Sequence, residues 1–283
     1  GISLYRPGPM DFIPIYVMGK NHPDQITYKC KELAPILAPT YGCIVYQEQV
    51  MQIVRDLGGY TLGRSDMLRR VMSKKKPSVM EKERKNFVYG NPEEGVPGCL
   101  KNGISEKIAN EIFDEMTDFA NYAFNKSHAA GYAVIAYQTA WLKFYYPVEY
   151  MAALISSVMD KSSKISEYIL TCRRMGIQVL PPNINEGEGN FSVSEGRIRY
   201  GLSAIKSIGS PVIHSIVEER NQNGEFTSIK DFVERLSSKE VNKRTIENFI
   251  KAGAFDGLGA NRKQAMQSYP MMVERATQEK KNS

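Results

Sequence analysis

The sequence lacks the features of a membrane protein and of a disulfide-rich exported protein. Its most apolar stretch, residues 129–136, is far shorter than the roughly 20 residues that a bilayer span requires. The chain does not begin with a basic and then apolar leader, and its four cysteines form no Cys-x-x-Cys pair, which disfavours export, a disulfide framework and a zinc site. Because an initiator methionine is also missing, we expect a piece of a longer cytoplasmic protein with reduced thiols.

The clustered carboxylates of phosphoryl-transfer enzymes are missing too. Two-metal sites hold their cations with such clusters, and the sequence has no Asp-x-Asp. Its Glu-x-Glu pairs, Glu81 with Glu83 and Glu186 with Glu188, lie in a basic run and in a Gly- and Asn-rich segment, where we expect solvated surface. There is no Walker-type loop and no Gly-x-Ser-x-Gly. We therefore expect no catalytic residue and no metal site here, and no phosphoryl transfer by this chain alone.

Positive charge is present instead, and it is concentrated in one segment. The 283 residues carry a net charge of +6, which is a weak sign of a polyanionic partner. Residues 64–85 contain nine basic and three acidic residues, and this surplus equals the whole net charge. The basic residues of the run are Arg64, Arg69, Arg70, Lys74, Lys75, Lys76, Lys82, Arg84 and Lys85.

The apolar periodicity predicts a mainly α fold. Six prolines interrupt residues 1–40, where we expect a mostly irregular segment. A short run before the two prolines at 181–182 and a hairpin over 191–200 are the predicted strands. Helices are predicted over about 50–57, 66–72, then up to about 89, 105–119, 127–146, 147–159 and 163–175, and again from residue 201 onward.

Arg69 and Arg70 form the first of three candidate phosphate-binding constellations. On a helix their side chains lie about 100° apart, with Lys74 one turn further along. Two guanidinium groups presented by a helix suit the non-bridging oxygens of phosphate. The alternative is a solvated charged face, and this segment alone leaves both possibilities open.

The second constellation is Lys126-Ser127-His128, with Tyr132 one turn later. If Ser127 caps a helix, the unpaired amides and the positive dipole end next to Lys126 make an anion site. His128 and Tyr132 are four residues apart, so they lie on one helix face and offer a platform on which a base pair can stack. The alternative for His128 is a packed core histidine.

The third constellation resembles a helix-hairpin-helix over residues 201–211. A short helix, a turn at Ile208-Gly209 and a new helix capped by Ser210 would let backbone amides approach a phosphate without regard to base sequence. A second, degenerate copy is predicted over 242–255. Basic residues flank the two copies, which favours contact with DNA. The alternative is a pair of helical hairpins that only pack together and bind no DNA. The flanking residues are Lys206, Lys243, Arg244 and Lys251.

Several long motifs, in chain order, resemble the alpha subunit of bacterial DNA polymerase III. The resemblance covers nearly the whole chain and is closest to the shorter alpha-subunit type. The segments that carry it are Ser3–Asp11, Tyr46–Met51, Leu68–Arg70 with Lys74–Lys76, Phe124–His128, Tyr137–Lys143 and Arg197–Leu202.

This resemblance implies a role for the first two constellations. Arg69 and Arg70 would hold the incoming deoxynucleoside triphosphate, with Lys126 assisting, and His128 and Tyr132 would face the nascent base pair. The residues expected to bind nucleotide are Arg69, Arg70, Lys74, Lys126, Ser127, His128 and Tyr132. Those expected to bind primer-template DNA are Lys75, Lys76, Lys206, Gly209, Ser210, Lys243 and Arg244, and Arg6 is placed near the nucleotide.

The resemblance also implies the architecture. We expect a polymerase fingers domain over 1–176, short strands and a helix-hairpin-helix module over 177–270, and a tail over 271–283. The catalytic carboxylates and their Mg²⁺ would lie in a preceding palm, and other replisome subunits would bind elsewhere on the parent chain. Two alternatives stay open: a non-catalytic DNA-binding protein of helix-hairpin-helix type, and the fingers of an error-prone polymerase paralogue.

Overall fold

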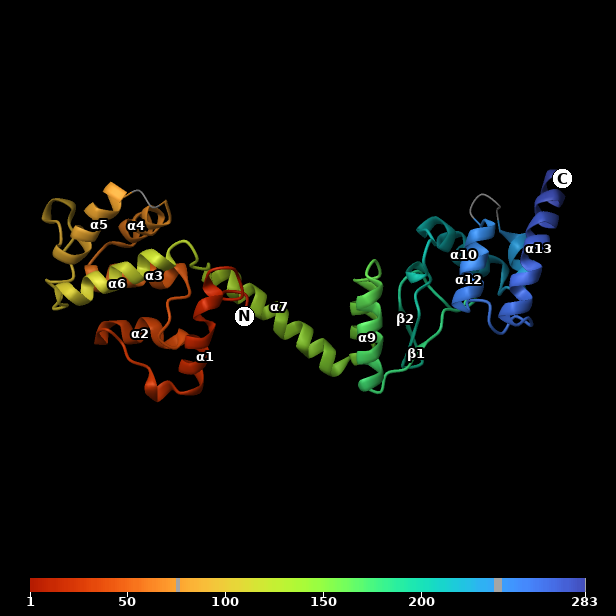
Figure 1. Cartoon of the computed structure of the whole chain (residues 1–283), viewed down its shortest axis with the longest axis horizontal. Coiled ribbons are helices and arrows are strands. Elements are labelled where there is room, and N and C mark those ends of the chain that lie inside the picture. The colour runs from red at the N-terminus through yellow and green to blue at the C-terminus, as the bar shows by residue number, and fades with distance from the viewer. Residues whose placement is uncertain (75–76, 237–240, 283) are drawn as a thin grey trace. The chain divides into compact units, whose positions relative to one another are not determined.

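The computed structural model of the protein describes residues 1–74, 77–236 and 241–282. Its contacts divide the chain into two compact units, Gly1–Tyr137 and Gln138–Ser283. Figure 1 shows the order of the elements, which are helices except for three short strands in the described ranges. The predicted mainly α fold is therefore confirmed.

The first unit is built from helices joined by 3-10 turns and glycine-containing loops. Its amphipathic helices bury one face each, because apolar residues recur at three- and four-residue spacing. Ile53 of one such helix and Phe113 of another are fully or almost fully buried in the shared core, together with Phe87. Its α-helices are α1 (Ile13–Asn21), α2 (Ala34–Leu37), α3 (Gln47–Gly58), α4 (Leu62–Lys74), α5 (Pro77–Tyr89), α6 (Glu106–Phe119) and the start of α7 (Lys126–Tyr145).

Local signals placed several of these helices correctly. The end of α3 at Gly59, where φ is 77°, and the capping of α6 by Ser105, whose hydroxyl accepts from the Ile108 amide, are both confirmed. The expectation of an irregular start was wrong over α1, since Pro14 lies in the first turn of that helix, where a missing N–H costs nothing.

Gln49 fixes the position at which α3 begins. Its Oε1 accepts from the backbone amides of Val45 at 2.9 Å and Tyr46 at 3.0 Å. Its Nε2 donates to the Ile36 carbonyl at 3.2 Å and to Thr40 Oγ1 at 2.7 Å. Because this amide is buried, one side chain satisfies four polar partners that water does not reach.

The second unit opens with two helices packed on a small sheet. The helices are α8 (Pro147–Ser156) and α9 (Ser162–Arg174), and Gly176 adopts φ 74° just after α9. The strands are β1 (Val179–Leu180), β2 (Ser192–Ser194) and β3 (Arg197–Arg199), in the order β1-β3-β2. β2 and β3 form the predicted hairpin, closed by Glu195 and Gly196 at φ 51° and 71°, as a two-residue turn of type I′ requires.

Four more helices complete the second unit around a core of phenylalanines. Phe232 lies at the centre, with ring centroids 4.9 Å from Phe226, 6.2 Å from Phe249 and 5.0 Å from Phe255. The helices are α10 (Ser210–Asn223), α11 (Ile229–Arg235), α12 (Lys243–Ala252) and α13 (Arg262–Asn282).

Two arginines hold the loop that precedes β2. Arg220 of α10 donates to the carbonyls of Ile184 and Gly187 at 3.0 and 2.6 Å and pairs with Glu188 at 2.6 Å. Arg199 of β3 pairs with Glu186. The side chains of the two glutamates are exposed, as expected, but they serve as counterions of buried arginines.

The predicted tail over 271–283 is corrected by α13, which continues to Asn282. Ala276 of this stretch is buried in the phenylalanine core, so the helix is still packed at that residue. The compact units divide within α7, whereas the expected border between fingers and helix-hairpin-helix module lies after residue 176. That functional division stays a prediction. In the described ranges, no helix combines the length and the hydropathy of a membrane span.

Replacing Gln49 by alanine should destabilise the first unit by about 2–4 kcal/mol, because it strands buried donors and acceptors. Urea unfolding followed by circular dichroism measures the loss, and amide exchange at Val45 and Tyr46 should accelerate. Gln52→Ala, at a half-buried position of the same helix, is the control. Equal unfolding free energies for the two variants would contradict the role given to Gln49.

Candidate phosphate-binding surfaces

Arg69 and Arg70 converge on one carboxylate of their own helix. Arg69 Nη2 lies 2.8 Å from Asp66 Oδ1, and Arg70 Nε lies 2.8 Å from Asp66 Oδ2. The hydrogen bond from Arg69 is the main reason that the pKa of the Asp66 carboxyl falls below its ordinary value. The Arg70 side chain is 68% exposed and that of Arg69 18% exposed, so the pair presents one open and one anchored guanidinium.

Three further basic residues of the run, Arg64, Lys82 and Arg84, pair with an acid that lies outside it in the sequence. Lys82 contacts Glu94 at 2.7 Å, and Arg84 contacts Asp114 at 2.5 Å. Arg64 pairs with both Glu83 and Glu94. The prediction that Glu83 is solvated was wrong, since it is only 5% exposed and is held by Arg64. The charge surplus of the segment is therefore partly neutralised by the fold.

Of the three consecutive lysines at 74–76, only the first lies within the described residues. Lys74 is exposed at the end of α4. Lys75 and Lys76 lie outside the described residues.

Arg6, which was expected near the nucleotide, makes contacts within the fold. It donates to the carbonyls of Ser3 and Tyr122, and its guanidinium lies 4.9 Å from the centroid of the Phe124 ring. It therefore ties the start of the chain to the segment that leads into α7.

The start of α7 corrects one detail of the second constellation. Ser127 does not cap the helix; Asn125 does, because its Oδ1 accepts from the His128 amide at 3.2 Å and α7 begins at Lys126. The sequence contained this signal, since asparagine is at least as good an N-cap as serine. The Lys126 amide is also engaged, by both carboxylate oxygens of Glu48 at 3.2 and 3.0 Å.

Four predicted residues of α7 lie on its exposed surface. Lys126, Ser127 and His128 are exposed, and Tyr132 is 56% exposed. The interpretation of His128 as a packed core residue is thus not supported. Lys126 Nζ lies 6.0 Å from the centroid of the Tyr46 ring, so this ammonium turns back toward the start of α3.

Helix α3 connects the first two constellations within the first unit. Glu48 at its start contacts α7, and a groove of about 310 Å³ runs beside α3 to the first residue of α4. The contacts described above for Arg69 and Arg70 lie further along α4. The residues that line the groove are Glu48, Met51, Gln52, Arg55 and Leu62.

The hairpin of the third constellation is present with a different cap. Gly209, with φ −87°, is the N-cap of α10, and Ser210 is its first residue, without a side-chain cap. The residue that adopts the left-handed conformation is Ser207, at φ 66°. Any residue can adopt the backbone conformation of Gly209, and a Cβ there would meet only Pro211 Cδ at 3.6 Å. Because Gly209 has no side chain, the surface of the turn stays open.

Helix α12 lies against this turn and brings two of the predicted basic residues together. Arg244 Nη2 donates to Ser207 Oγ at 3.4 Å, and Asn248 Nδ2 donates to the Lys206 carbonyl at 3.0 Å. Lys243 instead pairs with Glu274 of α13 at 2.7 Å. Lys206 and Arg244 thus form one cationic edge of the hairpin, while the charge of Lys243 is shared with an acid.

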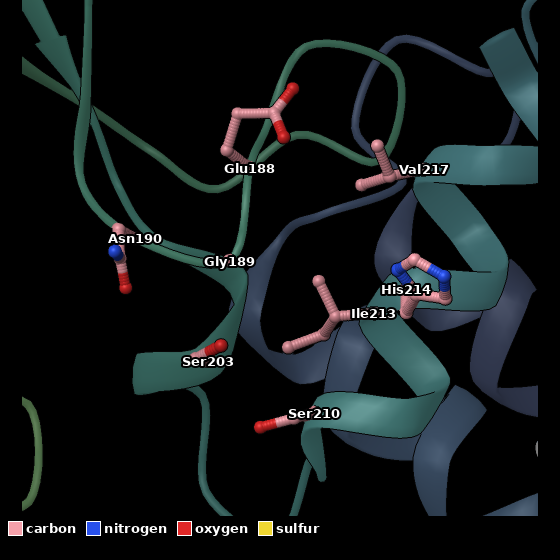
Figure 2. A pocket seen from close by; sticks show the side chains of 8 residues that line it. All are labelled: Glu188, Gly189, Asn190, Ser203, Ser210, Ile213, His214 and Val217. Atoms are coloured by element: carbon pink, nitrogen blue, oxygen red, sulfur yellow. The ribbon is translucent and has the colours of Figure 1, made fainter.

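Two hollows flank the hairpin. Figure 2 shows the first, of about 470 Å³, between α10 and the loop before β2. The second, of about 400 Å³, is lined by Tyr200, Lys206, Asn248 and Lys251 among others. The motif over 201–211 predicted Ser210 as a binding residue but gave no sign of the loop residues on the other side of the first hollow. The tertiary fold brings that loop next to α10. The lining of the first is Glu188, Gly189, Asn190, Ser203, Ser210, Ile213, His214 and Val217.

Acidic and sulfur-containing side chains do not gather into a metal site in the described parts of the chain. Cys30, Cys43, Cys99 and Cys172 are free thiols, as predicted. Burial raises the pKa of Cys99 to about 12, so this thiol stays protonated and unreactive at neutral pH.

Comparison with known proteins finds similarity in both units. Residues 1–95 match the finger domain of the bacterial DNA polymerase III alpha subunit, and residues 176–265 match a helix-hairpin-helix motif. Three relatives are named DNA polymerase III subunit alpha. The chain is 47% identical to that of Thermus aquaticus over 91% of its length, 45% to that of Neisseria meningitidis serogroup B over 100%, and 43% to that of Escherichia coli K12 over 99%. It spans 21–24% of the length of these relatives.

Arg69→Ala should raise the pKa of Asp66 toward its ordinary value more than Arg70→Ala does, because the hydrogen bond from Arg69 contributes most to the shift. Since the folded pKa is depressed, the pairing stabilises the fold above the unfolded pKa of about 3.9 and is lost as pH falls through the lower folded value. Carboxyl carbon chemical shifts followed against pH measure the change. An Asp66 titration unaltered in both variants would refute the pairing.

Proposed function

Because the chain belongs to the family of bacterial DNA polymerase III alpha subunits, we propose that it supplies the fingers and a helix-hairpin-helix module of a DNA-directed DNA polymerase. In this proposal the first unit binds the incoming deoxynucleoside triphosphate, and the region over 177–270 binds primer-template DNA. We assign the activity to a longer parent protein, because the chain spans about a quarter of the length of the Neisseria meningitidis relative.

The observation that carries the nucleotide-binding role is the convergence of Arg69 and Arg70 on Asp66. Two guanidinium groups that reach one carboxylate from adjacent positions can also reach one phosphate, whose oxygens accept the same forked hydrogen bonds. Both arginines lie within the match to the finger domain. We infer that a triphosphate takes the position of the Asp66 carboxylate, with Lys74 one turn away.

The start of α7 supplies the second part of the proposed nucleotide site. Lys126 and the amide end of the helix favour phosphate by charge and dipole. His128 and Tyr132, exposed on α7, offer aromatic surface to the nascent base pair. Ser127 lies between Lys126 and His128 in the first turn.

In the parent enzyme the primer 3′-hydroxyl would attack the α-phosphate in line, with loss of pyrophosphate. The contribution of this chain is to hold and orient the triphosphate by fixed cationic groups, which lowers the barrier by preorganisation. Mg²⁺, which supplies charge stabilisation when bound, would be held by carboxylates of the parent chain outside this segment. Other replisome subunits would likewise bind elsewhere on the parent chain.

For DNA binding we propose the edge formed by Lys206, Gly209, Ser210 and Arg244. The open turn allows the amides at the start of α10 to approach a phosphate, while the two cationic side chains flank it. Lys243 would join this edge by exchanging Glu274 for a phosphate. The alternative of a stand-alone DNA-binding protein loses support, because each of the three relatives matches at least 91% of the chain, spanning both regions.

Arg70→Ala in the parent polymerase should lower kcat/KM for nucleotide incorporation by the equivalent of about 2–4 kcal/mol, the usual cost of removing a preorganised donor. Steady-state incorporation of a single nucleotide measures it. Lys85→Ala, in the same basic run but on α5, is the control and should leave kcat/KM within about twofold. Unchanged kinetics in Arg70→Ala would remove the central support of the proposal.

Lys206→Ala and Arg244→Ala should each weaken duplex binding and reduce the slope of log affinity against log salt by about 1, since each removes one phosphate contact. Fluorescence anisotropy of a labelled primer-template at several salt concentrations gives both quantities for the parent polymerase. Lys164→Ala, on α9, is the matched control. A slope equal to that of the control in both variants would exclude this edge as the DNA contact.

A further inference from the structure

Glu48 lies where the anion of the predicted α7 site was expected. It is the second residue of α3, and both of its carboxylate oxygens accept from the amide of Lys126, the first residue of α7, at 3.2 and 3.0 Å. These residues are 78 positions apart, so the contact is a product of the tertiary fold. The place that a phosphate oxygen would take is filled by an anion of the protein.

Backbone hydrogen bonds bring the two helix starts together at this point. The Gln47 amide donates to the Phe124 carbonyl at 3.0 Å, and the Phe124 amide donates to the Val45 carbonyl at 3.0 Å. Glu48 therefore belongs to the first turn of α3 while its carboxylate touches the first amide of α7. Both helix dipoles present their positive ends to it, which favours a negative charge from either side.

A phosphate could replace this carboxylate without leaving the amide unsatisfied. The Glu48 side chain is only half-buried, and it lines the 310 Å³ groove that extends along α3 past Met51 and Gln52. That open space gives the side chain room to rotate away. The Lys126 amide would then exchange one anionic acceptor for another of higher charge.

We propose that Glu48 is an intramolecular stand-in for a nucleotide phosphate: it holds the start of α7 in its binding geometry and is displaced when the triphosphate arrives. The inference rests on the proposed function. Its consequence is that the charge of Glu48 lowers the affinity of the fingers for triphosphate and for pyrophosphate. Glu48 is thus a positioning residue that sets affinity and takes no part in the chemical step.

Glu48→Gln in the parent polymerase separates charge from geometry, because the amide oxygen still accepts from Lys126 while the negative charge is lost. Removing one unit charge near a bound phosphate at the edge of a protein is expected to lower the KM for nucleotide, and the inhibition constant of pyrophosphate, about 3- to 10-fold. Steady-state incorporation with pyrophosphate as inhibitor gives both, and kcat should not rise in proportion. The difference should shrink as ionic strength increases.

Two further variants make the result interpretable. Glu111→Gln removes the same charge from an exposed position of α6 and should leave both constants unchanged. Glu48→Ala removes the acceptor as well, so it should lower the melting temperature while still lowering KM. If Glu48 were only a helix cap, Glu48→Ala would lose stability and neither variant would lower KM, which would overturn the inference.

The outcome is distinguishable from failure of the proposed function. If Arg70→Ala raises KM or lowers kcat while Glu48→Gln leaves KM and pyrophosphate inhibition unchanged or weaker, the nucleotide site stands and the stand-in role falls. If Arg70→Ala also has no effect, the proposed function itself fails. Lower constants in Glu48→Gln alone would support an anion site at the start of α7.

Discussion

The junction at which α3 and α7 begin is the constraint on which the first unit depends. Phe124 donates its amide to the Val45 carbonyl and accepts from the amide of Gln47, the first residue of α3. The Gln49 side chain accepts from the Val45 and Tyr46 amides in the same turn. Helix starts carry amides that the helix itself cannot satisfy. The fold satisfies them mutually here, with Glu48 and Asn125 taking two amides at the start of α7. The result is a concentrated positive end at which a negative charge is favourable.

Carboxylates recur as local partners of the cations that sequence patterning picked out. Asp66 holds Arg69 and Arg70, Glu83 holds Arg64, and Glu274 holds Lys243. The Arg64–Glu83 pair is largely buried. The other pairs are more exposed and contribute little to stability, but each orients a long side chain that would otherwise sample many rotamers. A cation held in place by a weaker anion is ready for exchange with phosphate, which accepts more hydrogen bonds and carries more charge.

The helix-hairpin-helix region depends both on local sequence and on contacts between residues far apart in the chain. The turn, the glycine and the start of α10 follow from residues close together in the sequence. The cationic edge exists only because the phenylalanine core holds α12 against the turn, which lets Arg244 reach Ser207. The hollow in Figure 2 likewise requires Arg220, from within α10, to fix the facing loop.

The sequence predicted the mainly α class, most helix positions and the β2–β3 hairpin from periodicity, capping and turn chemistry within a few residues, whereas the likeness to a polymerase family came from its motifs in chain order. It also found the exposed cations Arg70, Lys126 and Lys206. The folded structure was needed to show which acid faces each cation, that Glu83 is buried, and that Glu48 contacts the start of α7. Such pairings join residues distant in the chain, and their energy depends on burial and distance, which no local pattern encodes.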